Sequence, residues 1–266
     1  MSRQPPPWLW WNVFSLDAPT IAVLWQDFLA QSTGLPLRLP GRLALGLTVW
    51  AIYVADRLLD IRHPSSSIDT QRHRFYQRHT KALSGLLAVI VAVDVLVIFL
   101  WLRPAVFMAG LVPLLGVGVY LGLFHGRRFA LPKELIVAFL FTAGTFVVAE
   151  SGSTHLTKIL IWPAGAFFAL CLANLVAIET WESRELSSRK TRQPNGFIRF
   201  LGRWYLAWVP GLAVLCFAHG QQAWYLAAGL SAAFCALIYW AAPRASLELR
   251  RTLVDVALLT PVLFLR

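Results

Sequence analysis

The chain has few charged residues: Asp, Glu, Lys and Arg make up only 14% of its 266 residues, against about a quarter in soluble domains. Its three cysteines, Cys171, Cys216 and Cys235, all lie in apolar segments. They behave as small hydrophobes, so we predict neither a disulfide nor a zinc site. The amino-terminal stretch lacks a basic region followed by a clean apolar run and a cleavage site, so we expect no signal peptide.

Long apolar segments fill most of the sequence instead. Hydrophobic residues make up 58% of the chain, and 12 residues are tryptophan. A membrane-spanning helix needs about 20 mostly apolar residues. We therefore predict an all-α, polytopic membrane protein that forms a single domain over residues 1–266. About nine transmembrane helices are expected, at 13–30, 42–60, 82–102, 104–124, 133–150, 158–181, 204–218, 222–242 and 250–265.

The basic residues alternate between the loops that join these segments. With the amino terminus inside, most of the 24 Lys and Arg residues fall on the cytoplasmic side, as the positive-inside rule requires. The net charge of +11 is thus spread over alternate loops rather than gathered in one stripe, and we expect no nucleic-acid partner. Membrane lipids and an anionic substrate are the partners that this distribution of positive charge favours. We predict no required protein partner.

Two acidic clusters stand at the cytoplasmic ends of apolar segments. Asp56 and Asp60 in YVADRLLD are spaced i,i+4, and Glu179, Glu182 and Glu185 in NLVAIETWESRE are spaced i,i+3, so each set shares a helix face. Adjacent anions repel, which implies a cation. Sparse carboxylates beside a diphosphate are the usual way that proteins hold Mg²⁺.

Ion pairing is the alternative for both clusters. Asp56 and Asp60 could form ion pairs with Arg57 and Arg62. Glu182 and Glu185 could likewise pair with Arg189 and Arg184. The cytoplasmic loops also carry basic residues that suit phosphate oxygens. These include Arg72, Arg127, Arg128 and Lys133.

Three further carboxylates lie in the apolar segments. We expect structural roles for two of them, and the third has no assigned role. Asp17, just before Ala18 and Pro19, reads as an N-cap. Asp255 lies four residues after Arg251, a spacing that predicts an ion pair. Asp94 lies near the middle of an apolar segment and must be paired, protonated or facing a cavity.

With these residues in place, the chain resembles the UbiA-type intramembrane prenyltransferases over essentially its whole length. YVADRLLD stands where that family has Asn-x₃-Asp-x₃-Asp, with its aspartates at Asp56 and Asp60 and Ile52 in place of the Asn. The second acidic motif corresponds to the glutamates of ANLVAIETWESRE, with Asn174 one to two turns earlier. The stretch VYLGLFHGRRFALPKE resembles the family's diphosphate-binding region, with Tyr120, Arg127 and Arg128 as the matching positions.

The resemblance implies nine helices around a central cavity in the inner (cytoplasmic) membrane, with the acidic motifs facing the cytoplasm. It implies Mg²⁺-dependent transfer of a prenyl group from a polyprenyl diphosphate to a lipophilic, often aromatic, acceptor. Mg²⁺ would be held by Asp56, Asp60, Glu179 and Glu182. The diphosphate would be bound by Arg72, Arg127, Arg128, Tyr120 and Asn174. A catalytically silent relative that serves as a scaffold or lipid-binding protein is the alternative.

The charge asymmetry predicts a nine-helix topology with a cytoplasmic amino terminus, because basic loops are retained on that side. Reporter fusions near residues 70, 155 and 195 measure this directly. Fusions near 70 and 195 should report the cytoplasm and a fusion near 155 the opposite side. A shared side for 70 and 155 would contradict the topology.

Overall fold

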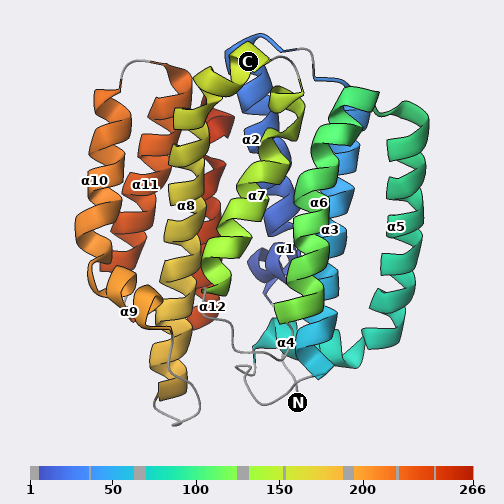
Figure 1. Ribbon diagram of the computed structural model, residues 1–266. Coiled ribbons are helices and arrows are strands. Elements are labelled where there is room, and N and C mark those ends of the chain that lie inside the picture. The colour runs from blue at the N-terminus through green and yellow to red at the C-terminus, as the bar shows by residue number, and fades with distance from the viewer. Residues whose placement is uncertain are drawn as a thin grey trace.

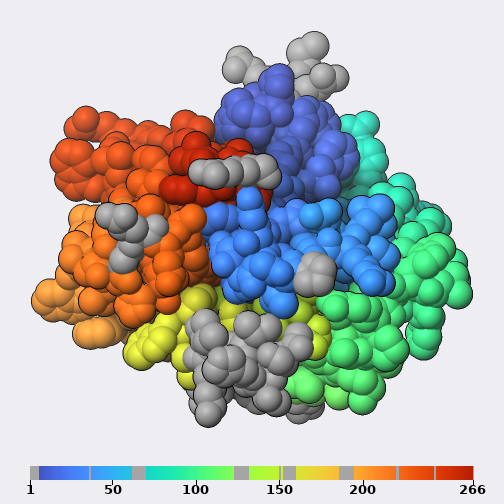
Figure 2. Space-filling model, turned by 90° about the horizontal axis from the view of Figure 1, so that it is seen from above, coloured from blue at the N-terminus to red at the C-terminus, as the bar shows by residue number. Residues whose placement is uncertain are grey.

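The computed structural model describes residues 6–35, 37–62, 70–124, 132–151, 154–187, 195–219, 222–242 and 244–265. All regular structure within these ranges is helical, which confirms the predicted all-α class. Long helices run side by side, up and down the molecule (Figure 1). In the view from above, the region of the α2–α3 turn lies in the middle, with α5 and α6 on one side and α10 and α11 on the other (Figure 2).

The helices follow one another with short connections. The first segments are η1 (Pro7–Leu9), α1 (Trp10–Val13), α2 (Asp17–Thr33), α3 (Leu39–Arg62) and the short α4 (Gln71–Arg78). They are followed by α5 (Thr80–Trp101), α6 (Pro104–Phe124), α7 (Lys133–Glu150) and α8 (Thr154–Ser187). The chain ends with α9 (Gly196–Arg203), α10 (Tyr205–Ala218), α11 (Ala223–Ala241), α12 (Leu247–Val256) and η3 (Ala257–Leu263).

Four helical stretches in the described part of the chain are long and apolar enough to cross a membrane. They are Thr80–Trp101, Pro104–Gly122, Leu160–Glu185 and Ala223–Ala241; α9 and α10, bent by 70° at Trp204, make a fifth if they count as one span. The described part of the chain therefore has four or five candidate membrane spans, which is consistent with a membrane protein. Each of the nine predicted ranges overlaps a helix, but α2, α3, α7 and α12 do not meet this criterion by themselves.

The outer faces of these spans are apolar. Within an 18-residue apolar stretch of each helix, only 17% of the residues in Thr80–Trp101 and 6% of those in Pro104–Gly122 are buried inside the protein. Large side chains such as Phe99, Val112 and Leu115 are exposed. A soluble monomer rarely exposes contiguous apolar surface of this extent. Lipid is the solvent that such faces require.

Two segments between the predicted membrane helices contain helical structure. The segment between the ranges 42–60 and 82–102 includes α4, and the segment between 158–181 and 204–218 includes the end of α8 and all of α9. The α4 helix forms because Thr70 caps it, accepting a hydrogen bond from His73 N, and because Tyr76 is buried. The Tyr76 hydroxyl is 2.7 Å from that of Ser15, which ties α4 to the amino-terminal segment.

The main core gathers around Trp25, which is fully buried on α2. Its ring packs against Phe28, Phe167 and Trp224, and its indole Nε1 donates a 2.8 Å hydrogen bond to the carbonyl of Leu258. One side chain thus joins α2, α8, α11 and η3.

We expect Trp25→Ala to lower the free energy of unfolding by about 3–5 kcal/mol, because it leaves a large cavity and an unpaired carbonyl. Denaturant unfolding in detergent measures the change. Trp240→Ala is the matched control, since Trp240 is 69% exposed on α11 and should cost little. Equal losses for the two variants would contradict this picture of the core.

Candidate functional site

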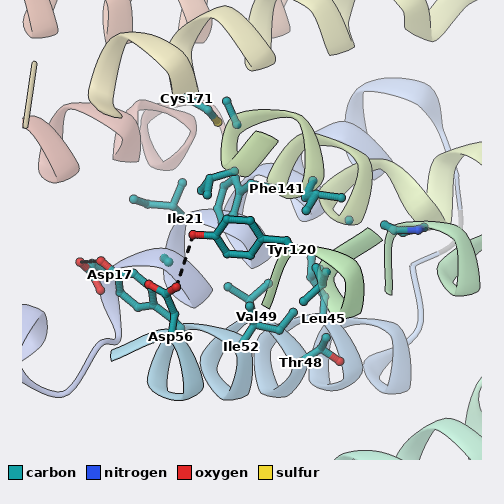
Figure 3. Close-up of a pocket in the computed structure, with 18 of the residues that line it drawn as sticks. Asp17, Ile21, Leu45, Thr48, Val49, Ile52, Asp56, Tyr120, Phe141 and Cys171 are labelled. Carbon is teal, nitrogen blue, oxygen red and sulfur yellow. Dashed lines mark hydrogen bonds between the residues drawn. The ribbon is translucent and has the colours of Figure 1, made fainter. Parts of the chain in front are cut away.

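A pocket of about 380 Å³ lies between the helices. Most of its wall is apolar, with Leu45, Val49 and Ile52 on α3 facing Phe141 on α7 across the space (Figure 3). The lining residues on α3 run from Gly41 to Asp60, which is about 28 Å along a helix that rises 1.5 Å per residue. The pocket is therefore long as well as apolar.

The charged lining residues collect at one end of this pocket. Helices α3, α6 and α8 finish there, and α7 and α12 begin there, so residues distant in sequence meet. Seven acidic residues line the pocket against four basic ones. The acids are Asp17, Asp56, Asp60, Glu134, Glu179, Glu182 and Asp255, and the bases are Arg57, Arg72, Lys133 and Arg251.

The first predicted acidic pair lies on the pocket wall. The Tyr120 hydroxyl, from α6, donates a hydrogen bond of 3.4 Å to Asp56 Oδ1 (Figure 3). Asp60 Oδ2 is 3.9 Å from Arg57 Nη1, at the outer limit of an ion pair, and the Asp60 side chain is half exposed. The structure thus brings Tyr120 to the acidic pair.

Two of the three predicted glutamates on α8 line the same pocket. Glu179 is buried. Glu182 Oε1 is 2.5 Å from Arg251 Nη1 on α12. This partner comes from α12, which lies against α8 here. Arg189, the alternative partner predicted for Glu182, lies outside the described residues. Glu185 is exposed and is not among the lining residues.

Arg72, which was predicted to bind phosphate, lies at the polar end of the pocket. It is buried on α4, and its Nη1 donates to Asn12 Oδ1 at 3.3 Å and to the Tyr53 hydroxyl at 3.4 Å. Burial, reinforced by the charges of Arg251 and Arg57, lowers the pKa of Arg72 to about 10, so its guanidinium stays charged at neutral pH. Arg127 and Arg128, predicted for the same role, lie outside the described residues.

A third set of polar residues, joined by hydrogen bonds that the sequence did not predict, lies at the same end of the pocket. Asn12 Nδ2 donates to Asp17 Oδ2 at 2.9 Å and to Asp255 Oδ2 at 3.0 Å. Asn174 Nδ2 donates to Asp255 Oδ1 at 2.9 Å. Asn174, which was predicted to bind diphosphate, thus lines the pocket and donates to a carboxylate.

Two expectations about these carboxylates were wrong. Asp17 is the first residue of α2 and makes no capping hydrogen bond; Leu16 holds the cap position. Arg251 pairs with Glu182, whereas Asp255 is held by the two amides. The only sequence signal was that both acids lie in otherwise apolar segments, since their shared partner Asn12 is 243 residues from Asp255.

Asp94 is paired, one of the states expected for it. The Thr48 hydroxyl, from α3, donates a 2.5 Å hydrogen bond to Asp94 Oδ2. Asp94 is buried and is not among the residues that line the pocket. This hydrogen bond joins α3 and α5.

The carboxylates fit a metal ion that a substrate helps to bind. Within the described ranges, no three His, Cys, Asp or Glu side chains form a ready-made metal site. Mg²⁺, however, commonly takes only one or two carboxylates, keeps several waters and completes its shell with substrate phosphates. Asp56 and Asp60 on α3, and Glu179 on α8, are hard oxygen ligands of this kind.

Comparison of the chain with protein-family models, curated proteins and solved structures gave no match. Function is therefore inferred from the residues of the pocket.

We expect Arg251→Met to lower the free energy of unfolding by about 3 kcal/mol or more, because it leaves the Glu182 carboxylate without its partner at a largely buried position. Denaturant unfolding of purified protein measures this, and the double variant Glu182→Leu/Arg251→Met should recover much of the loss. The control is Arg42→Met, which breaks the more exposed pair with Asp27 and should cost about 1 kcal/mol or less. No recovery in the double variant would show that the pair is not the reason.

Proposed function

We propose that this protein is an intramembrane prenyltransferase of the UbiA type, which transfers a prenyl group from a polyprenyl diphosphate to a lipophilic acceptor with the help of Mg²⁺. One observation carries the proposal. Acidic residues of α3 and α8, together with the buried residues Arg72 and Arg251, line one end of a long pocket whose other walls are mostly apolar. A polyprenyl diphosphate has the same division, with an anionic head on an apolar tail.

Charge supports a divalent cation as the third component. The pocket lining has three more acidic than basic residues among those described. A diphosphate is itself a multiple anion, so it cannot lie beside Asp56, Asp60 and Glu179 without cations between them. Mg²⁺ held by Asp56, Asp60, Glu179 and Glu182 would supply Lewis-acid stabilisation of the diphosphate leaving group.

The chain's own residues would bind and orient the donor. Arg72 and Lys133, both on the pocket wall, would neutralise phosphate oxygens as the allylic C–O bond breaks and its electron pair leaves with the diphosphate. Tyr120 would hold Asp56 in place through its hydrogen bond. The ring faces of Tyr53 and Phe141, also on the wall, are suited to stabilising the allylic cation, and the apolar wall excludes water.

The proposed function also implies nine transmembrane helices around a central cavity, with the polar end of the pocket facing the cytoplasm. The alternation of basic loops supports this orientation. The overlap of all nine predicted segments with helices supports the count. Helices such as α3, whose own apolarity is modest, could then span the membrane because their polar residues face the pocket.

A catalytically silent scaffold or lipid-binding protein is the second candidate. It is favoured by the engagement of Glu182 with Arg251 and by Ile52 on the pocket wall, where the resembled family has an Asn. The two candidates share the apolar pocket and differ in whether its polar end binds a metal-diphosphate group.

We expect purified protein to bind a labelled polyprenyl diphosphate in Mg²⁺ and to lose that binding in EDTA, because repulsion between the acids and the phosphates is then uncompensated. Asp56→Asn and Asp60→Asn, which keep side-chain size, should lower prenyl transfer by orders of magnitude, since about 1.4 kcal/mol of lost stabilisation is tenfold in rate. Equilibrium binding and membrane transfer assays measure the two effects.

Asp94→Asn is the matched control, as Asp94 is a buried carboxylate that is not among the residues that line the pocket. It should leave binding and transfer near wild type. Binding that survives EDTA, or transfer that survives both α3 substitutions, would favour the silent scaffold.

A further inference from the structure

Asp17 and Asp255 form a second pair of carboxylates in the pocket, separate from the acids of α3 and α8. Both are almost fully buried, with exposures of 3% and 7%. A single amide nitrogen, Asn12 Nδ2, bonds to one oxygen of each, at 2.9 and 3.0 Å. The two carboxylates are therefore neighbours across one nitrogen atom.

The pair lacks the compensation that buried carboxylates normally have. Within the described part of the chain neither forms an ion pair. Arg72, the cation whose charge acts most on Asp17, donates to Asn12 and Tyr53 instead, and Arg251, whose charge acts on Asp255, is bound to Glu182. Asp17 Oδ1 is buried and has no hydrogen-bond partner there. Because an unpaired buried oxygen costs free energy, and because Asp17 lies on the pocket wall, a hydrogen-bond donor on a bound molecule would complete this site.

The pair is also close to the acids assigned to the diphosphate. The Tyr53 hydroxyl is 3.3 Å from Asp17 Oδ2, and Tyr53 lies one helical turn before Asp56 on α3. Asp17 and Asp56 lie on the same side of the pocket in Figure 3. A head group held at Asp17 would therefore lie beside the reacting end of the donor.

We infer that Asp17 and Asp255 bind the head group of the acceptor, and that this head group is a neutral one with hydrogen-bond donors, such as a phenol or other hydroxyl, and not a carboxylate. The role as acceptor subsite rests on the proposed function; the binding chemistry does not. Two adjacent buried carboxyl groups that share one proton still carry a negative charge, so they repel a third carboxylate and accept hydrogen bonds from hydroxyl groups. Apolar and aromatic neighbours, Ile21 and Phe141 among them, suit the ring or chain that carries the hydroxyl.

The test compares two ligands on purified wild-type protein by equilibrium dialysis. One is pentylresorcinol, and the other is the hydroxybenzoate that has the same pentyl chain but a carboxylate in place of one hydroxyl. We expect pentylresorcinol to bind at least about tenfold more tightly, the difference expected for one hydrogen bond to a charged group. Asp17→Asn should reduce this ratio to within about threefold.

Asp94→Asn again serves as the control and should retain the wild-type ratio. Equal or tighter binding of the hydroxybenzoate to wild-type protein overturns the inference, and this comparison needs no variant that must fold. An unchanged ratio in folded Asp17→Asn also overturns it. Mg²⁺-dependent binding of polyprenyl diphosphate by Asp17→Asn separates the two proposals. If the variant binds the diphosphate but wild-type protein binds pentylresorcinol and the hydroxybenzoate equally well, only the acceptor subsite is wrong. If wild type discriminates but binds no diphosphate, the prenyltransferase proposal is wrong and the hydroxyl-binding site stands.

Discussion

The high cost of placing charge in an apolar surrounding is the constraint on which this structure depends. The helices expose apolar side chains over their outer faces, so ionised groups that do not reach water must find partners inside. The chain meets this requirement by bringing its described buried acids and bases, Asp94 excepted, to one end of the pocket. There, Arg251 meets Glu182, Arg72 meets Asn12 and Tyr53, and amides hold Asp17 and Asp255.

This concentration gives the pocket two distinct parts. The polar end has the chemistry to hold anionic groups through cations and to hold hydroxyl groups directly, whereas the remaining wall is mostly apolar, with Leu45, Val49 and Phe141 among its residues and Gln26 and Thr48 as uncharged polar exceptions. The long helix α3 contributes to both parts, with Gly41 and Asp60 at opposite limits of its lining residues. A single amphiphilic molecule can thus occupy the site in one orientation.

The sequence predicted the features that are local. Apolar run lengths predicted the positions of most helices, and the i,i+4 spacing of Asp56 and Asp60 predicted that they share one face, because helix periodicity alone determines both. The i,i+4 argument failed for Asp255, since spacing indicates which side chains can meet and not which do. Arg251 turned to Glu182 on α8 instead, and no local pattern links Asn12 to Asp255. The small helix α4 was missed because its burial depends on a contact between Tyr76 and Ser15.

Diffraction from crystals grown with Mn²⁺ and an unreactive thiodiphosphate analogue of a prenyl donor tests the central claim most directly, because the anomalous signal locates the metal without reference to activity. The account predicts Mn²⁺ at the polar end, at a coordination distance of about 2.1–2.2 Å from a carboxylate of Asp56 or Asp60, with the analogue's phosphates on its other side and its tail along the apolar wall. An analogue bound in the pocket with no metal beside Asp56 and Asp60, or a metal bound only elsewhere, would contradict it.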